Sequence, residues 1–269
     1  MLTAVDVRKH FKGLNALDNA SIDVQRGEIV GLVGPNGSGK TTLLNILSGF
    51  TRADSGRIQI GDTKVNRLPS WEVMRLGIGR TFQAPQLPSR MTVMETMLCA
   101  AKLPTGESFF GALLRREKVR AEERQAAERA AKLLTRLGIP GVGDQRATDL
   151  SGGQQKLLAL GLVLMRSPKL LMLDEPTAGI NPTLRRSMVD LLKGLTQEKE
   201  ISMLIVEHDM EFIQRLCSRV FVLDKGVVVA ESKPSELADN PRVVEAYLGK
   251  RRVSDPAPST PADVAGESR

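Results

Sequence analysis

Residues 34–42 read Gly34-Pro35-Asn36-Gly37-Ser38-Gly39-Lys40-Thr41-Thr42. This stretch fits the P-loop pattern, in which a glycine and four further residues precede Gly-Lys followed by Ser or Thr. The glycines allow backbone N–H groups to converge on phosphate oxygens at the start of the next helix. Residues 29–33 directly before it are apolar, as expected of a strand buried on both faces of a parallel sheet. The stretch therefore predicts a strand, a phosphate-binding loop and a helix over residues 41–47.

Two side chains of this loop would take part in binding. The Lys40 ammonium would neutralise phosphate charge, and the Thr41 hydroxyl suits Mg²⁺, because this ion prefers oxygen ligands and keeps several waters. A glycine-rich turn without a ligand is the alternative. We expect contacts with a nucleotide along the whole loop, made by Gly34, Pro35, Asn36, Gly37, Ser38, Gly39, Lys40, Thr41 and Thr42.

Asp174 and Glu175 follow a second apolar run, which begins at Lys169. Ligands of open α/β sheets bind at the carboxyl ends of the strands, so we expect both carboxylates to lie beside the phosphate loop. Asp174 would hold Mg²⁺ through water, and Glu175 would be the general base that orients the attacking water. The same residues could simply end a strand, but the phosphate loop favours the catalytic interpretation.

A second glycine-rich stretch, residues 150–156, reads Leu-Ser-Gly-Gly-Gln-Gln-Lys and precedes a helical pattern that runs to Met165. Ser151 would cap this helix, and the first amides of the helix would face an anion. An ordinary helix start has the same composition, so the stretch gains its meaning from the P-loop. Two phosphate-binding elements far apart in one chain indicate a nucleotide held between two copies of the fold. The expected contacts are Ser151, Gly152, Gly153 and Gln154.

Strand and helix patterns alternate along most of the chain, which predicts an α/β fold with a mainly parallel sheet. A helical subdomain is inserted at 88–165, where apolar residues recur at three- and four-residue steps. We divide the chain into one domain over 1–250 and a tail over 251–269, whose composition predicts disorder. Strands of an antiparallel layer are expected at 2–8 and 20–26, and hairpins at 57–61 with 64–65 and at 220–223 with 227–230. Other strands are expected at 169–173 and 201–206, and helices at 91–102, 112–137, 185–197 and 210–217.

The composition is that of a globular protein. Of the 269 residues, 41% are hydrophobic, and no apolar run reaches the roughly 20 residues of a membrane helix, so we expect a cytosolic chain. A chain with a net charge of +7 could bind nucleic acid or an anionic membrane surface. Nucleic acid is not expected as a partner, because only 3% of the residues are aromatic and no base-stacking surface is recognisable. Cys99 and Cys217 are expected to be buried or neutral thiols that bind no zinc.

The order of these motifs resembles that of the ATP-binding cassette (ABC) ATPases over residues 2–250. The resemblance implies a P-loop NTPase fold of the ABC type and Mg²⁺-dependent ATP hydrolysis in a head-to-tail dimer. In such a dimer, Ser151 and Gly153 of one subunit would contact the γ-phosphate that the P-loop of the other subunit holds.

The resemblance also implies roles for three side chains that would otherwise be taken as structural. Phe11, placed ahead of the antiparallel layer, would stack on adenine. Gln83 would approach Mg²⁺ and connect the site to the helical subdomain, and His208 would contact the γ-phosphate. With Lys40 and Glu175, Gln83 and His208 form the expected catalytic set.

Two residues depart from the family pattern. Asn181 stands where most cassettes carry aspartate, which leaves the cross-dimer contact of this loop open. Leu162 stands where many cassettes carry an arginine, and we expect it to affect local packing rather than chemistry.

Four segments are similar to the ATPase subunits of branched-chain or hydrophobic amino acid importers, namely residues 77–83, 177–182, 206–210 and 240–249. This similarity implies two transmembrane permease subunits, a second ABC ATPase that is identical or related, and an extracytoplasmic substrate-binding protein. The chain would then lie at the cytoplasmic side of the inner or plasma membrane. A permease helix would dock near Gln83 to Met97, where Phe82, Leu87, Met91 and Met94 either line a groove or belong to the core.

Other functions of a cassette remain alternatives. A urea or amide importer and a lipid or lipopolysaccharide exporter would use the same ATPase. A non-transport cassette usually has two ATPase units or a long coiled coil, which this chain lacks in its sequence. A P-loop kinase or GTPase is disfavoured by the serine-glycine stretch at 151–153 and by the absence of a guanine-reading Asn-Lys-x-Asp segment.

Overall fold

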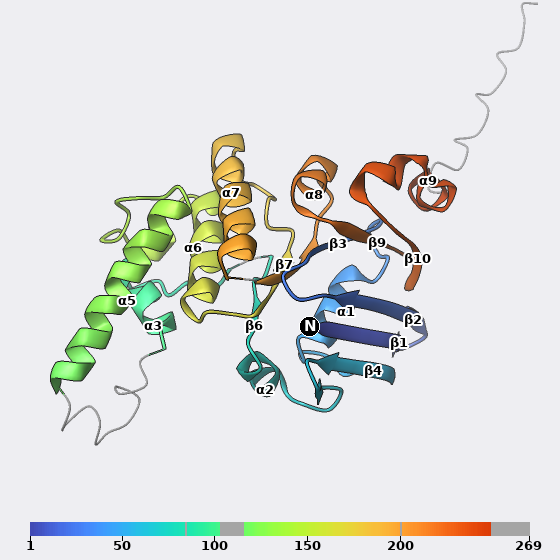
Figure 1. Cartoon of the computed structure of the whole chain (residues 1–269), viewed down its shortest axis with the longest axis horizontal. Helices are drawn as coiled ribbons and strands as arrows, with labels where there is room; N and C mark the ends of the chain where they lie inside the picture. Colours follow the sequence, from blue (N-terminus) through green and yellow to red (C-terminus); the bar gives the residue numbers. More distant parts are fainter. Residues whose placement is uncertain (84, 103–115, 200, 249–269) are drawn as a thin grey trace, which may run out of the picture.

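The computed structural model describes residues 1–83, 85–102, 116–199 and 201–248 (Figure 1). Its strands form one six-stranded and one four-stranded sheet, and a group of helices lies to one side of the larger sheet. This arrangement confirms the expected α/β fold with a mainly parallel core, an antiparallel β layer and a helical part. The domain bounds at 1–250 and 88–165 stay predictions, and the tail at 251–269 lies outside the described residues.

The larger sheet contains β3 (Ile29–Val33), β6 (Ile78–Arg80), β7 (Leu170–Asp174), β8 (Ser202–Val206), β9 (Arg219–Asp224) and β10 (Val227–Ser232). The strands lie in the order β10-β9-β3-β8-β7-β6, and all neighbours are parallel except β10 and β9. β3, β7 and β8 are buried along their whole length, as their continuous apolar runs predict. Because β3 is central, the loop that follows it leaves from the middle of the sheet edge.

Strand β6 was not predicted from the sequence. It is only three residues long, so it has no periodicity, and it is recognised by its parallel pairing with β7. Its middle residue, Gly79, packs so closely on a helix that a Cβ would lie 2.4 Å from the Val163 Cγ1 atom. β6 adds a strand at the sheet edge directly before Gln83.

The smaller sheet contains β1 (Leu2–Phe11), β2 (Leu14–Val24), β4 (Ser55–Ile60) and β5 (Thr63–Lys64), in the order β2-β1-β4-β5. β1 extends beyond the predicted 2–8, and β2 begins before the predicted 20–26 but already ends at Val24. Register shifts around Val7 and a positive φ of 52° at Asp6 interrupt the alternation in β1. The hairpin between β4 and β5 is confirmed. Phe11 was expected ahead of this layer, but it is the last residue of β1 and belongs to the sheet.

The described helices are α1 (Lys40–Leu47), α2 (Ser70–Arg75), α3 (Val93–Ala100), α5 (Arg116–Arg136), α6 (Gly152–Met165), α7 (Pro182–Lys199), α8 (Met210–Leu216) and α9 (Pro241–Leu248), with 3-10 helices at Ala147–Asp149 and Pro234–Asp239. Figure 1 shows α3, α5 and α6 together on the left. Helices α3 and α6 pack closely, since a Cβ at Gly161 of α6 would lie 3.2 Å from the Met97 sulfur of α3. The helix expected at 112–137 is confirmed from Arg116 onward, and 112–115 lie outside the described residues.

Within the part of the chain that the structure describes, no helix has the combined length and apolar character of a membrane span. Cys217 is buried, and burial raises the pKa of its thiol to about 12, so the thiol is neutral as expected. Cys99 is exposed, so of the two expected alternatives, a buried or a neutral thiol, burial does not apply to this residue. On α3 the buried side chains are Val93, Thr96 and Met97, which leaves Cys99 outside the packed face.

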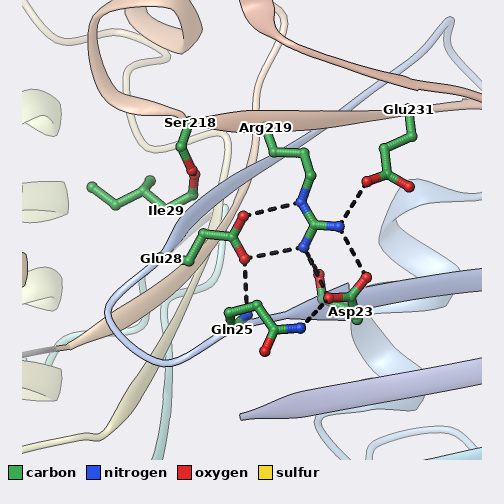
Figure 2. Close-up of polar contacts among 7 residues, drawn as sticks. All are labelled: Asp23, Gln25, Glu28, Ile29, Ser218, Arg219 and Glu231. Atoms are coloured by element: carbon green, nitrogen blue, oxygen red, sulfur yellow. Dashed lines mark hydrogen bonds and ion pairs between the residues drawn. The ribbon is translucent and has the colours of Figure 1, made fainter.

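Arg219 joins the two sheets at the start of β9 (Figure 2). Its guanidinium donates to Asp23 of β2 at 2.9 and 3.0 Å, to Glu28 at 3.0 Å and to Glu231 of β10 at 2.7 Å. Gln25 donates a further hydrogen bond to Asp23 at 2.7 Å. The hydrogen bonds from Arg219 lower the pKa of the Asp23 carboxyl, and the carboxylates raise the pKa of Arg219. This network fixes the antiparallel layer against the parallel sheet.

We expect Arg219→Gln to lower the free energy of unfolding by about 2 kcal/mol, because three carboxylates lose a charged donor. Urea denaturation at neutral pH measures this loss. The pKa of Asp23 is depressed in the folded state, so its contribution is complete well above its ordinary value of 3.8 and is lost as the pH falls through the folded value. The difference in the free energy of unfolding between the wild-type chain and Arg219→Gln should therefore become smaller in acid.

The matched control is Arg215→Gln. Arg215 pairs only with Glu211 among the described side chains at 2.8 Å, and both side chains are more than half exposed. Such a pair contributes less than about 1 kcal/mol. Equal losses in the two variants would contradict the joining role of Arg219.

Candidate functional site

The loop between β3 and α1 forms the centre of the site. Gly34 and Gly39 have φ angles of 151° and 106°, and a Cβ would come within 2.0 Å of the Leu223 carbonyl oxygen at Gly34 and within 2.5 Å of the Ala16 carbonyl oxygen at Gly39. Only glycine fits at these positions. A Cβ at Gly37 would meet nothing within 4 Å, so the loop is open there. The chain thus forms a cradle of backbone at the N-terminus of α1, whose first turn carries no acidic residue.

Lys40 is the first residue of α1 and is only 6% exposed. Its ammonium donates to the carbonyl oxygens of Gly34 and Pro35, both at 2.9 Å. The charge is therefore held inside the cradle, where it can neutralise phosphate. Thr41, the next residue, is exposed. The cradle and these two side chains fit the phosphates of a nucleotide with a Mg²⁺ ion.

Glu175 lies between Gln83 and His208. Gln83 Nε2 donates to one carboxylate oxygen at 2.7 Å, and His208 Nε2 lies 3.0 Å from the other. Glu175 has a φ of 47°, a left-handed conformation, and its amide donates to the carbonyl of Val206. Gln83, Glu175 and His208 follow β6, β7 and β8 respectively, so three residues expected in one site meet at the same edge of the sheet.

Asp174 ends β7 directly before Glu175 and is 7% exposed. Burial raises the pKa of its carboxyl, and the positive charges of Arg80 and Lys40 oppose this rise. Because β7 ends at the same edge of the sheet as β3, Asp174 lies at the edge from which the phosphate loop leaves. Asp174 and the exposed Thr41 supply oxygen atoms of the kind that Mg²⁺ prefers.

Two supporting residues, Arg80 and Glu207, were not predicted. Arg80 lies 3.4 Å from the Asp174 carboxylate, and its only signal in the sequence is a charge inside an apolar segment. Glu207 is 3% exposed and accepts hydrogen bonds from the Thr177 amide and hydroxyl and from the His208 amide. Glu207 therefore joins the segment after Glu175 to the segment that carries His208.

The second glycine-rich stretch begins helix α6 as expected. The Gln154 amide donates to the Ser151 hydroxyl at 3.3 Å, and the Ser151 amide donates to the Gln154 side chain at 3.0 Å. The expected cap by Ser151 is confirmed, Gln154 completes it as a reciprocal capping box, and the first turn carries no acidic residue. A Cβ at Gly152 would meet nothing within 4 Å, so the helix start is open, whereas Gly153 packs on Gly179. Figure 1 shows α6 beside α5 and α7, away from α1.

The remaining expected residues have local roles in the structure. Phe11 is 44% exposed and lies 5.2 Å from the Lys9 ammonium. Asn181 accepts a hydrogen bond from the Leu184 amide at the start of α7. Leu162 packs on the main core, as do Leu87 and Met94, which were also considered as lining of a docking groove.

The described residues contain no group of three or more His, Cys, Asp or Glu side chains that could hold a metal ion. A structural zinc site of that kind is therefore not formed by this part of the chain. The magnesium interpretation depends on hydroxyl, carboxylate and phosphate oxygens instead.

The ABC transporter family model matches residues 17–178. The chain is 41% identical over 249 residues to the probable branched-chain amino acid transport ATP-binding protein LivG of Archaeoglobus fulgidus, which covers 93% of this chain and 95% of that protein. It is 34% identical over 250 residues to the high-affinity branched-chain amino acid transport ATP-binding protein LivG of Escherichia coli. This match covers 93% of this chain and 98% of that protein.

Solved structures of ATP-binding cassettes are also similar to the chain. The ADP conformation of MJ1267, an ATP-binding cassette of an ABC transporter, superposes with a TM-score of 0.77 at 35% identity and covers 93% of this chain and 98% of that one. The dimeric structure of MJ0796, a bacterial ABC transporter cassette, superposes with a TM-score of 0.74 at 26% identity. It covers 87% of this chain and 99% of that one.

We expect Lys40→Ala to weaken nucleotide binding by about 10- to 100-fold, because one charged hydrogen-bond donor to phosphate is lost. Titration with a fluorescent ADP analogue measures the dissociation constant. Lys64→Ala is the control, since Lys64 is exposed on β5. A Lys40 variant that binds like the control would contradict the assignment of the phosphate site.

Proposed function

This chain belongs to the ABC transporter family, and we propose that it is the ATP-hydrolysing subunit of an importer for branched-chain or other hydrophobic amino acids. The observation that carries the hydrolytic role is the Glu175 carboxylate held between Gln83 and His208, beside the buried Asp174. The amino acid class is supported by the relatives, which are named as branched-chain amino acid transport ATP-binding proteins.

Glu175 acts as the general base. The two contacts orient its carboxylate, which accepts a proton from a water as the water oxygen attacks the γ-phosphorus. The bond to the β,γ-bridging oxygen breaks, and ADP and phosphate result. Lys40 balances the phosphate charge, and His208 contacts the γ-phosphate. Mg²⁺, which Thr41, Gln83 and Asp174 would hold, supplies further charge neutralisation on the phosphates.

ATP is bound between two subunits. One subunit supplies the P-loop, Phe11 for the adenine ring and the carboxylates. The other supplies the start of α6, where Ser151, Gly152, Gly153 and Gln154 form a helix N-terminus that is open at Gly152 and carries no acidic residue in its first turn. The separate positions of α1 and α6 in one chain support this arrangement (Figure 1). The second subunit is an identical or a related ABC ATPase, and ATP binding closes the pair while hydrolysis reopens it.

The ATPase works with two transmembrane permease subunits at the cytoplasmic side of the membrane, and an extracytoplasmic protein delivers the substrate. No nucleic acid takes part. A cytoplasmic segment of the permease docks beside Gln83, where Phe82 is 47% exposed next to Phe50 at 51%. Leu87 and Met94 serve the core instead. Exposed aromatic side chains are enriched in such interfaces.

We expect Glu175→Gln to reduce ATP hydrolysis by roughly 100-fold or more, because the amide cannot accept the proton of the attacking water. Nucleotide binding should persist, and ATP should trap a dimer that gel filtration resolves. Glu211→Gln is the control, as this carboxylate is exposed on α8. Unchanged steady-state turnover in the Glu175 variant would refute its role as the base.

A further inference from the structure

Arg80 is a buried charge that the hydrolytic mechanism above does not use. It ends β6 and is 6% exposed. One guanidinium nitrogen donates to the Ser48 hydroxyl at 2.6 Å, and another lies 3.4 Å from the Asp174 carboxylate. Ser48 follows α1, the helix that carries Lys40. Arg80 thus connects the far end of the phosphate-loop helix to the carboxylate expected on the Mg²⁺ side.

Two aromatic rings cover the same guanidinium. Its central carbon lies 5.0 Å from the ring centroid of Phe82 and 5.6 Å from that of Phe50. The rings meet edge to face, with centroids 5.2 Å apart and planes at 89°. Both rings are about half exposed. One side of Arg80 therefore faces the site, and the other side is covered by rings that a partner can reach.

Burial disfavours this charge, and it lowers the pKa of Arg80 although Asp174 opposes the effect. Within the described residues its Nε atom has no hydrogen-bond partner. A buried ion pair with incomplete hydrogen bonding contributes little to stability compared with apolar packing. The arrangement is better explained by orientation of the carboxylate, which cannot rotate without losing the guanidinium contact.

We propose that Arg80 is a positioning residue for the Asp174 carboxylate, and that the Phe50–Phe82 pair holds the guanidinium in place. A permease segment seated on the two rings would then act on Asp174 through Arg80. This inference rests on the proposed function of the site. Partners that orient a metal-ligating carboxylate typically change metal affinity by about 10- to 100-fold when they are removed.

The test uses the whole chain with ADP and Mn²⁺, whose binding is followed by electron paramagnetic resonance. Arg80→Met should weaken the Mn²⁺ affinity of the enzyme–ADP complex by about 10-fold or more. Its affinity for ADP in EDTA should stay unchanged, because the P-loop is intact. Arg80→Lys should recover part of the Mn²⁺ affinity. Wild-type Mn²⁺ affinity in Arg80→Met would overturn the proposal.

A second arm tests the aromatic pair. Phe82→Ala should weaken Mn²⁺ binding in the same direction, and the double variant with Arg80→Met should bind no more weakly than Arg80→Met alone. Trp71→Ala is the matched control, because Trp71 is 55% exposed and has Arg75 at 4.9 Å from its ring centroid. Loss of affinity in Trp71→Ala as large as that in Phe82→Ala, or no loss in Phe82→Ala, would overturn the aromatic link.

Ser48→Ala provides a second test in case Arg80→Met does not fold. It removes the 2.6 Å hydrogen bond to the guanidinium and keeps the charge, and a reduced Mn²⁺ affinity is expected. If Arg80→Met does not fold, the other two variants decide. Wild-type Mn²⁺ affinity of the enzyme–ADP complex in both Ser48→Ala and Arg80→Lys overturns the proposal. Failure of the proposed function would give a different result from failure of the Arg80 proposal. The wild-type chain itself would then bind ADP and Mn²⁺ without hydrolysing ATP.

Discussion

Parallel pairing of β6, β7, β8 and β3 is the constraint on which the site depends. Because these strands run in the same direction, the residues that follow them emerge at one edge of the sheet. The phosphate loop, Gln83, Glu175 and His208 come from four separate parts of the sequence and are gathered there. The antiparallel layer is a separate sheet, and the Arg219 network holds it against this core.

The charges at this edge are arranged in layers. Lys40 is held by loop carbonyls, Asp174 is buried beside Arg80, and Glu175 is in contact with the side chains of Gln83 and His208. The inner groups are fixed by burial, whereas Glu175 and His208 are partly exposed. Such a division suits a site whose inner part binds phosphate and whose outer part performs proton transfer. Glu207 gives the outer part a buried support through Thr177 and His208.

The sequence predicted the parts of the fold that have strong local signals. Continuous apolar runs revealed β3, β7 and β8, and the residues after them included Asp174 and Glu175. The serine before Gly152 correctly indicated a capped helix. The meeting of Gln83, Glu175 and His208 was expected from family resemblance, and the structure places these three side chains in contact. Their roles in ATP hydrolysis remain proposals.

Features that depend on contacts between distant segments were missed. β6 has three residues and no period, and Arg80 has meaning only through Ser48, Asp174 and the rings of Phe50 and Phe82. Nothing in the sequence near Phe50 indicates that it meets Phe82. β1 continues through its register shifts to Phe11, which the alternation over residues 2–8 did not indicate.

Isolation of the affinity-tagged chain from its native membranes tests the central claim most directly, with its partners identified by mass spectrometry. The account predicts two hydrophobic permease subunits, a second ABC ATPase and an amino-acid-binding protein. A lipid-exporter scaffold in their place would contradict the amino acid substrate and leave the ATPase chemistry intact. Ribosomes or DNA-repair factors, with no membrane protein present, would contradict the role in transport itself.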